Sequence, residues 1–212
     1  MADRFRCKTT RPAVRRYRSR VTPQTYPPIG SVALSPKARP SHFESKAALW
    51  TAAVDYLFGI LAQTVGGVIP ADLNKVDVAQ VAAGFADGIG RFVRFAAEHP
   101  ELNQIMVHEG TAASDRLTWM TKTHVKPFFD GIRPIWRMLH DAGMAAPIDH
   151  EILYYVLVGA ASLPYANAPE VPLLTGRDPT DPSWIGAHAD GLVAILLPGP
   201  AAQSNPARIG SQ

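Results

Sequence analysis

The hydrophobic pattern of the chain is helical from Ser41 to about residue 197. Apolar side chains return every three or four positions there, which places them along one face of a helix. No segment shows the alternation of apolar and polar residues that is typical of a half-buried strand. The pattern therefore predicts an all-α body. The expected helices cover residues 45–65, 77–99, 100–106, 114–140, 149–161 and 181–197.

Residues with strong backbone preferences mark the ends of these segments. Ser and Asp side chains accept a backbone N–H at a helix start, and Gly ends a helix readily. Pro100 suits the first turn of a helix, whereas Pro127 and Pro134 should kink or divide the segment 114–140. The expected N-caps are Ser45, Asp77 (or Asn74), Asp149 and Asp181 (or Ser183), and the expected stops are Gly66, Gly67 and Gly143.

The segment from Ile152 to Ala161 is apolar at nearly every position. A helix that is hydrophobic all round must be covered on all sides. Its own domain or a second subunit could supply that cover, and the pattern alone leaves both sources open.

The first 40 residues differ from the body in composition and charge. They hold six prolines and ten Lys or Arg against one acid, Asp3, so their net charge is +9, whereas residues 41–212 carry −6. Prolines at this density leave no room for a useful helix, and we expect residues 1–40 to be disordered. Such a basic block is typical of a solvated arm or of a sequence-independent contact with nucleic acid. Residues 198–212, rich in small residues and Pro, are expected to form a frayed tail.

Composition narrows the functional classes. The chain is 47% hydrophobic and 18% charged, as in a globular protein. No run approaches the roughly 18 apolar residues of a membrane span, and no apolar leader precedes the body, so we expect a cytoplasmic protein without membrane contact. The lone Cys7 cannot form an internal disulfide or a cysteine-based zinc site. Scattered histidines and the absence of a nucleophile motif predict no metal, no cofactor and no catalysis.

Two stretches resemble the tetracycline-repressor (TetR/AcrR) family of transcriptional regulators. The first is Ser-His-Phe-Glu-Ser-Lys-Ala-Ala-Leu-Trp at 41–50, which resembles the junction between the recognition helix and the fourth helix of that family. The second joins Phe92, Glu-His-Pro-Glu-Leu at 98–102 and Glu-Gly at 109–110 to Leu-Thr-Gly-Arg-Asp-Pro at 174–179 and Asp-Gly-Leu at 190–192. It is similar to the ligand-binding, dimerising half of one branch of the family.

The resemblance implies a homodimer whose N-terminal helix-turn-helix reads operator DNA, and whose larger helical domain binds a small apolar ligand. It implies phosphate contacts for His42 and Lys46, with Phe43 packing the DNA-binding part onto the fourth helix. It also places the dimer interface on the segment 152–161 and the last helix. The expected interface residues are Leu153, Val156, Leu157, Ala160, Ala189, Leu192 and Leu196.

Residues 1–40 depart from the family. They have the length of its first three helices but none of the apolar pattern, so a helix-turn-helix cannot be built from them. A frameshift upstream of His42 would account for a normal length with an abnormal composition. If residues 1–40 are instead native, we expect the DNA-binding function to be impaired or lost. The expected organisation is a basic segment at 1–40, the end of the DNA-binding region at 41–50, a ligand-binding and dimerisation domain at 51–197, and a tail at 198–212.

Large apolar side chains of the body are candidates for a ligand pocket, because helical bundles hold ligands between apolar faces. The sequence thus predicts a ligand-responsive regulator, most simply a repressor. The alternative is a helical, homodimeric small-molecule-binding or scaffold protein with a nonspecific basic arm. The predicted pocket residues are Met106, Trp119, Met120, His124, Phe128, Phe129, Trp136 and Tyr154.

Overall fold

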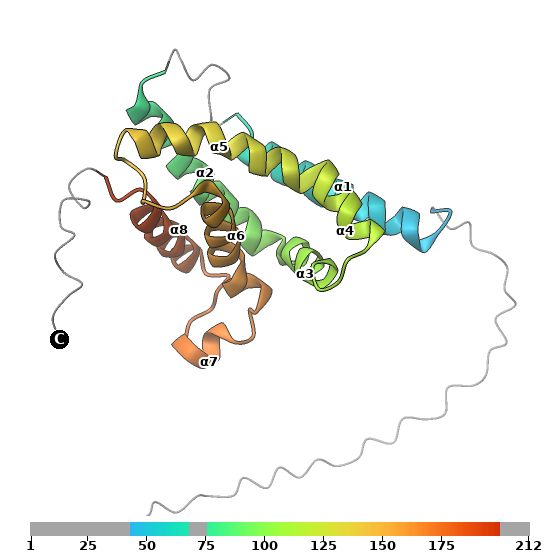
Figure 1. The fold of residues 1–212 in the computed structure, drawn as a ribbon. Coiled ribbons are helices and arrows are strands. Elements are labelled where there is room, and N and C mark those ends of the chain that lie inside the picture. Colours follow the sequence, from blue (N-terminus) through green and yellow to red (C-terminus); the bar gives the residue numbers. More distant parts are fainter. Residues whose placement is uncertain (1–42, 68–75, 200–212) are drawn as a thin grey trace, which may run out of the picture. The chain divides into compact units, whose positions relative to one another are not determined.

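The computed structural model describes residues 43–67 and 76–199, and the regular structure of these residues is all α-helical apart from one π-helical turn (Figure 1). The predicted all-α body is confirmed. Expectations for residues 1–42, including the phosphate contact of His42, and for 200–212 lie outside the described residues. The elements are α1 (Lys46–Val65), α2 (Val78–Glu98), α3 (Pro100–Glu109), α4 (Asp115–Met120), the π-helix η2 (Thr121–Val125), α5 (Lys126–Asp141), α6 (His150–Ala166), α7 (Val171–Thr175) and α8 (Pro182–Leu196).

Local capping sets several of these ends as the sequence predicts. The hydroxyl of Ser45 accepts a hydrogen bond from the Ala48 N–H at 3.1 Å, and α1 stops at Gly66. The carboxylate of Asp181 accepts from the Ser183 N–H at 2.7 Å and begins α8. Gly143 follows α5 with φ of 66°, a conformation that glycine adopts without steric cost.

The segment 114–140 is divided, but not at both prolines. The π-helix lies directly before Pro127, and the Lys126 N–H bonds to the Thr121 carbonyl five residues back. Pro127 has no N–H to continue the α-helical hydrogen bonds. The π-helical turn, which holds one residue more than an α-helical turn, is accommodated at this point. Pro134 stays inside α5. The short α7 was not predicted, because five residues are too few to show a helical period.

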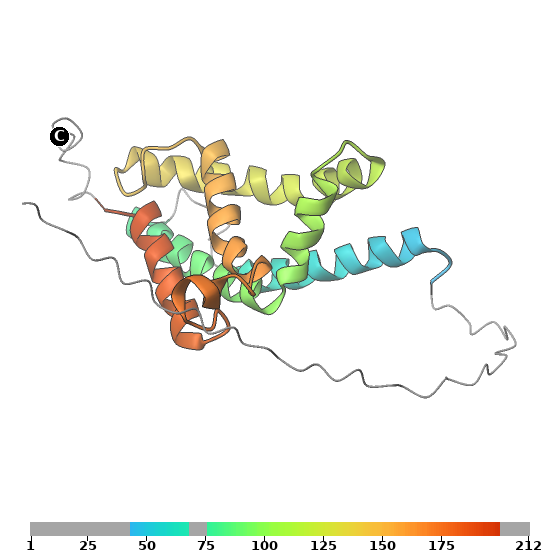
Figure 2. The same cartoon turned by 90° about the horizontal axis from the view of Figure 1, so that it is seen from below.

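Helix α2 is central to the body, and it contacts α1, α3, α5, α6 and α8 (Figures 1 and 2). Two groups of buried side chains pack around it. We call the first the main core; it joins α2, α5, α6 and α8 and includes Val81, Phe85, Ile89, Val93, Ile135, Trp136, Leu139, Leu153, Leu157, Tyr165, Leu192 and Leu196. We call the second the α1 core; it consists of Val54, Leu57, Phe58, Leu61, Phe95, Leu102 and Met120.

Among the described helices, α1 is long and apolar enough to cross a membrane by length and composition alone. Its 18-residue window has a mean hydropathy of 1.3, and 22% of that window is buried. Core helices of soluble proteins meet the same criteria. Asp55 lies at the middle of α1, where its carboxylate is 2.7 Å from His124 Nε2. This hydrogen bond to another helical segment and the packing of Val54, Leu57 and Leu61 in the α1 core fit a helix of a folded body.

Candidate functional site

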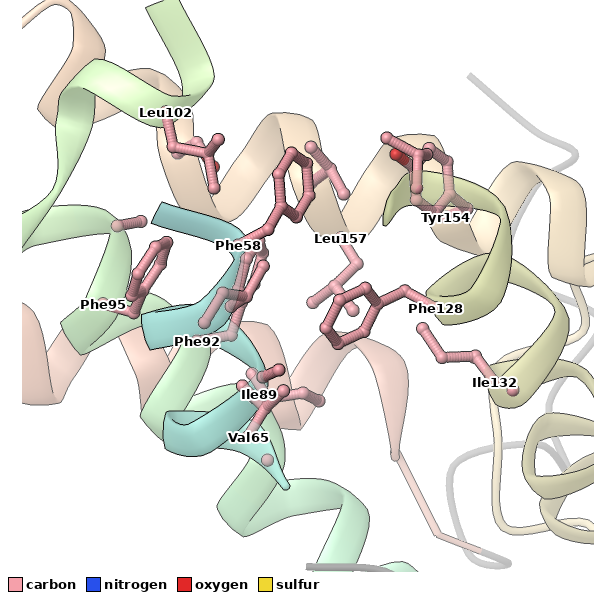
Figure 3. A pocket seen from close by; sticks show the side chains of 18 of the residues that line it. Phe58, Val65, Ile89, Phe92, Phe95, Leu102, Phe128, Ile132, Tyr154 and Leu157 are labelled. Carbon is pink, nitrogen blue, oxygen red and sulfur yellow. The ribbon is translucent and has the colours of Figure 1, made fainter. Parts of the chain in front are cut away.

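A cavity of about 640 Å³ lies between the main core and the α1 core (Figure 3). Its volume falls within the roughly 300–1,000 Å³ of small-molecule sites. The described residues that line it are Phe58, Leu61, Ala62, Val65, Gly66, Gly67, Phe85, Gly88, Ile89, Phe92, Phe95, Ala96, His99, Leu102, Asn103, Met106, Val125, Pro127, Phe128, Gly131, Ile132, Ile135, Tyr154, Leu157, Val158 and Ser162.

Helical periodicity explains how five helices supply most of this lining, with Leu102, Asn103 and Met106 coming from α3. Each of α1, α2, α5 and α6 contributes positions three or four residues apart, so that one face of each helix meets the cavity. On α5, for example, these positions are Phe128, Gly131, Ile132 and Ile135. Figure 3 shows side chains from these faces converging on a common space, with the aromatic rings of Phe58, Phe92, Phe128 and Tyr154 around it.

Four polar residues stand out among the apolar lining: His99, Asn103, Tyr154 and Ser162. His99 Nδ1 lies 3.1 Å from a carboxylate oxygen of Glu101, and its ring lies against Phe95 with centroids 5.0 Å apart. Burial raises the pKa of Tyr154 to about 12, so its phenol stays neutral at physiological pH. Ser162 is only 4% exposed and is the buried polar residue of the described chain.

Three of the eight predicted pocket residues line the cavity. They are Met106 on α3, Phe128 on α5 and Tyr154 on α6, which the fold brings together from three separate segments. The other five lie elsewhere, so that part of the prediction is corrected.

Trp119, Met120 and His124 surround α1 outside the cavity. Trp119 packs edge-on against Trp50, with ring centroids 5.7 Å apart. Met120 is 2% exposed and fills the α1 core. His124 stacks on Phe58 at 4.6 Å, so it contacts the back of a residue that lines the cavity. These side chains hold α1 against α4 and η2.

Phe129 and Trp136 also lie away from the cavity. Phe129 projects from the same helix as Phe128 but packs on His150 and Tyr154. Trp136 is buried in the main core, where its indole N–H donates to the Ile148 carbonyl at 2.8 Å. The position of a residue on α5 thus decides whether its side chain faces the cavity or the core. The size and hydrophobicity of the side chain do not reveal that position.

The predicted dimer residues are mostly internal. Leu153, Leu157, Ala189, Leu192 and Leu196 are buried in the main core of their own chain, and Leu157 also lines the cavity. They cannot form the surface that meets a partner, so this prediction is corrected for these five. Of the seven residues, a partner could reach the exposed Val156 and the half-buried Ala160.

Lys46 is the first residue of α1 and is exposed, and Phe43 just before it is 40% exposed. Both side chains are therefore accessible in the described part of the chain. Most of the apolar wall of the cavity and the polar residues His99, Asn103 and Ser162 were not predicted from the sequence. The sequence marks these residues only as positions on the inward face of a helix. Residues packed in a core without a cavity occupy the same kind of position.

The described residues do not bring three His, Cys, Asp or Glu side chains together as a metal site requires. The cavity instead offers apolar contact with a few neutral hydrogen-bonding groups, which suits binding of an organic molecule. No protein-family profile and no curated protein matches the chain.

Proposed function

We propose that the chain is a ligand-responsive, DNA-binding transcriptional regulator of the TetR type, most simply a cytoplasmic repressor, whose DNA binding is impaired if residues 1–40 are native and intact if a frameshift accounts for them. The observation that carries this proposal is the cavity of about 640 Å³ between the two cores. Protein interiors contain few voids larger than a water molecule, so an apolar space of this size favours a binding site over a packing defect. The sequence of residues 41–50 supports the DNA-binding part.

Helix α1 connects the cavity with the N-terminal part of the chain. Its second half lines the cavity through Phe58, Leu61 and Val65, whereas its first residue is Lys46. A ligand that fits one position of α1 better than another would shift the population toward that position. Operator affinity would change with it, which is the coupling that defines such a regulator.

An exposed apolar stripe on α6 supports the homodimer. Ile152, Tyr155 and Leu163 are 52%, 74% and 55% exposed, and they follow one another at helical spacing. The neighbouring α8 adds Ile195 and exposed positions with small side chains, which allow close approach of a second helix pair. The small residues are Gly186, Ala187, Gly191 and Ala194.

The dimer is tested by charging this stripe. Tyr155→Lys should produce monomers in sedimentation velocity, because it places a cation in the proposed interface. Leu173→Lys on α7 is the matched control, since Leu173 is even more exposed at 86% but lies off the stripe. Equal effects of the two variants, or none of Tyr155→Lys, would reject this interface.

The DNA-binding part is tested by selecting duplexes from a random library and titrating them at two salt concentrations. A regulator should prefer a particular sequence over its scrambled version by about a thousandfold or more. Lys46→Ala should weaken binding to all duplexes alike and reduce the salt slope by about one.

The second candidate function rests on the net charge of +9 in residues 1–40. A helical, homodimeric small-molecule-binding or scaffold protein with a basic arm would bind every duplex equally and with steep salt dependence. Uniform binding in the same titration would therefore favour this candidate and reject the regulator. Resequencing of the gene across the codons for 1–45 tests the frameshift hypothesis directly.

A further inference from the structure

The charge of the cavity wall limits what it can bind. Among the described residues that line it, none is Asp, Glu, Lys or Arg. The imidazole of His99 is already held by Glu101. A charged group inside the cavity would lose its hydration without gaining a side chain of opposite charge, which is unfavourable for binding.

Neutral hydrogen-bonding groups are present in the wall. The side chains of Asn103, Tyr154 and Ser162 line the cavity and have no hydrogen-bond partner within the described part of the chain. Ser162 is 4% exposed as a residue, and its hydroxyl is not among the buried unpaired atoms of the described chain, so this hydroxyl is open to the cavity. Polar groups that line a cavity without a protein partner are available to a ligand or to ordered water.

The three groups are divided between the two ends of the cavity. Tyr154 and Ser162 lie on the same face of α6, eight residues apart, which corresponds to about 12 Å along the helix. Leu157 and Val158 line the cavity between them.

Asn103 belongs to the Ser162 end. The neighbouring Gln104 donates to the carbonyl of Ala166, one turn beyond Ser162, and so fixes α3 against this part of α6. In Figure 3, Leu102 of α3 and Tyr154 likewise lie on opposite sides of the view, with Phe58 and Leu157 between them.

We propose that the cavity takes an uncharged, elongated and largely apolar molecule with neutral oxygen groups near both ends, such as a long-chain or fused-ring alcohol or ketone. One oxygen would bond to Tyr154 and the other to Ser162 and Asn103. This inference rests on the proposed ligand-binding function and adds the chemical class of the ligand.

The test uses probes of equal chain length with different end groups. The neutral fluorophore N-phenylnaphthylamine is bound to the full chain and displaced by decanediol with a hydroxyl at each end, by decanol, by decanoate and by decylammonium. Decanediol should bind more tightly than decanol, and both should bind about tenfold or more tightly than the two ions, because only the ions must lose a charged group's hydration.

Two variants then locate the hydroxyl groups. Tyr154→Phe and Ser162→Ala should each weaken decanediol by about threefold to tenfold, the value of one neutral hydrogen bond. Far-UV circular dichroism and urea denaturation of each variant control for loss of fold.

The outcomes separate this inference from the function on which it rests. Tighter binding of decanoate or decylammonium than of decanol would overturn the inference while leaving the binding site in place. Decanediol binding that ignores both variants would do the same. Failure of N-phenylnaphthylamine itself to bind would overturn the ligand-binding function and the inference together.

Discussion

Two leucines one turn apart on α6 provide a test of the cavity. Leu153 is 0% exposed and packs within the main core. Leu157 is 7% exposed, and one side of it faces the cavity. Leu153→Ala and Leu157→Ala remove the same atoms from the same helix, so differences in helix propensity cancel.

The surroundings set the magnitude. Replacing a buried Leu by Ala costs about 2–5 kcal/mol, depending on how tightly the side chain is packed and on the void that remains. Leu153 has neighbours on all sides, and we expect a loss of about 3–5 kcal/mol in the free energy of unfolding for Leu153→Ala. Leu157 has no partner atoms on its cavity side, so Leu157→Ala should cost only about 2–3 kcal/mol.

Ligand binding should show the opposite order. Leu157→Ala removes part of the cavity wall and should weaken N-phenylnaphthylamine by about threefold to tenfold, whereas Leu153→Ala should leave the affinity unchanged. Urea denaturation followed by far-UV circular dichroism and a fluorescence titration measure the two quantities. Equal losses of stability, together with an unchanged affinity of the Leu157 variant, would refute the assignment of Leu157 to a cavity wall.

Three other measurements address the packing around the cavity. His188 Nδ1 lies 3.0 Å from the Tyr165 hydroxyl and Nε2 lies 3.1 Å from the Ala160 carbonyl, and burial lowers the pKa of this histidine. In the unfolded chain the histidine keeps its ordinary pKa of 6.5 and takes up a proton first, so the free energy of unfolding should fall as pH drops below 6.5. His188→Gln should flatten this pH dependence in urea titrations. An unchanged dependence of the free energy of unfolding on pH would contradict it. Trp136→Phe should lower the free energy of unfolding by about 1 kcal/mol more than Trp184→Phe. The Trp136 N–H donates to Ile148, whereas the buried Trp184 N–H has no acceptor in the described part of the chain. Equal losses of stability in thermal unfolding would speak against this. Ser45→Ala should lower stability by about 1 kcal/mol through loss of the bond to Ala48, and Ser45→Asp should retain it; an unaffected Ala variant would show that this cap is not needed.

The helices could be predicted from the sequence because local chemistry sets their ends. Ser45, Asp77 and Asp181 occupy the N-cap positions of α1, α2 and α8, and Pro100 lies in the first turn of α3. These preferences act within a few residues of the chain. They do not depend on which helices meet in space, so one sequence is enough to read them.

The cavity could not be predicted in the same way. An inward position on a helix is apolar whether it faces a solid core or an empty space, as Trp136 and Phe128 on α5 illustrate. The same ambiguity misplaced the dimer residues, because Leu153 and Tyr155 are neighbouring apolar positions of α6 with opposite environments. Only the arrangement of α1, α2, α3, α5 and α6 decides which positions border the cavity.

The division of the body into two cores has a consequence for how it unfolds. Without a ligand, the main core and the α1 core are separated by the cavity, and each can open with its own free energy. Backbone amides of α1 should then exchange with solvent sooner than those of α8. A molecule that fills the cavity would touch both cores and join them into one cooperative unit. Binding would then slow the amide exchange of α1, the helix that begins at Lys46, because its C-terminal half would contact the bound molecule.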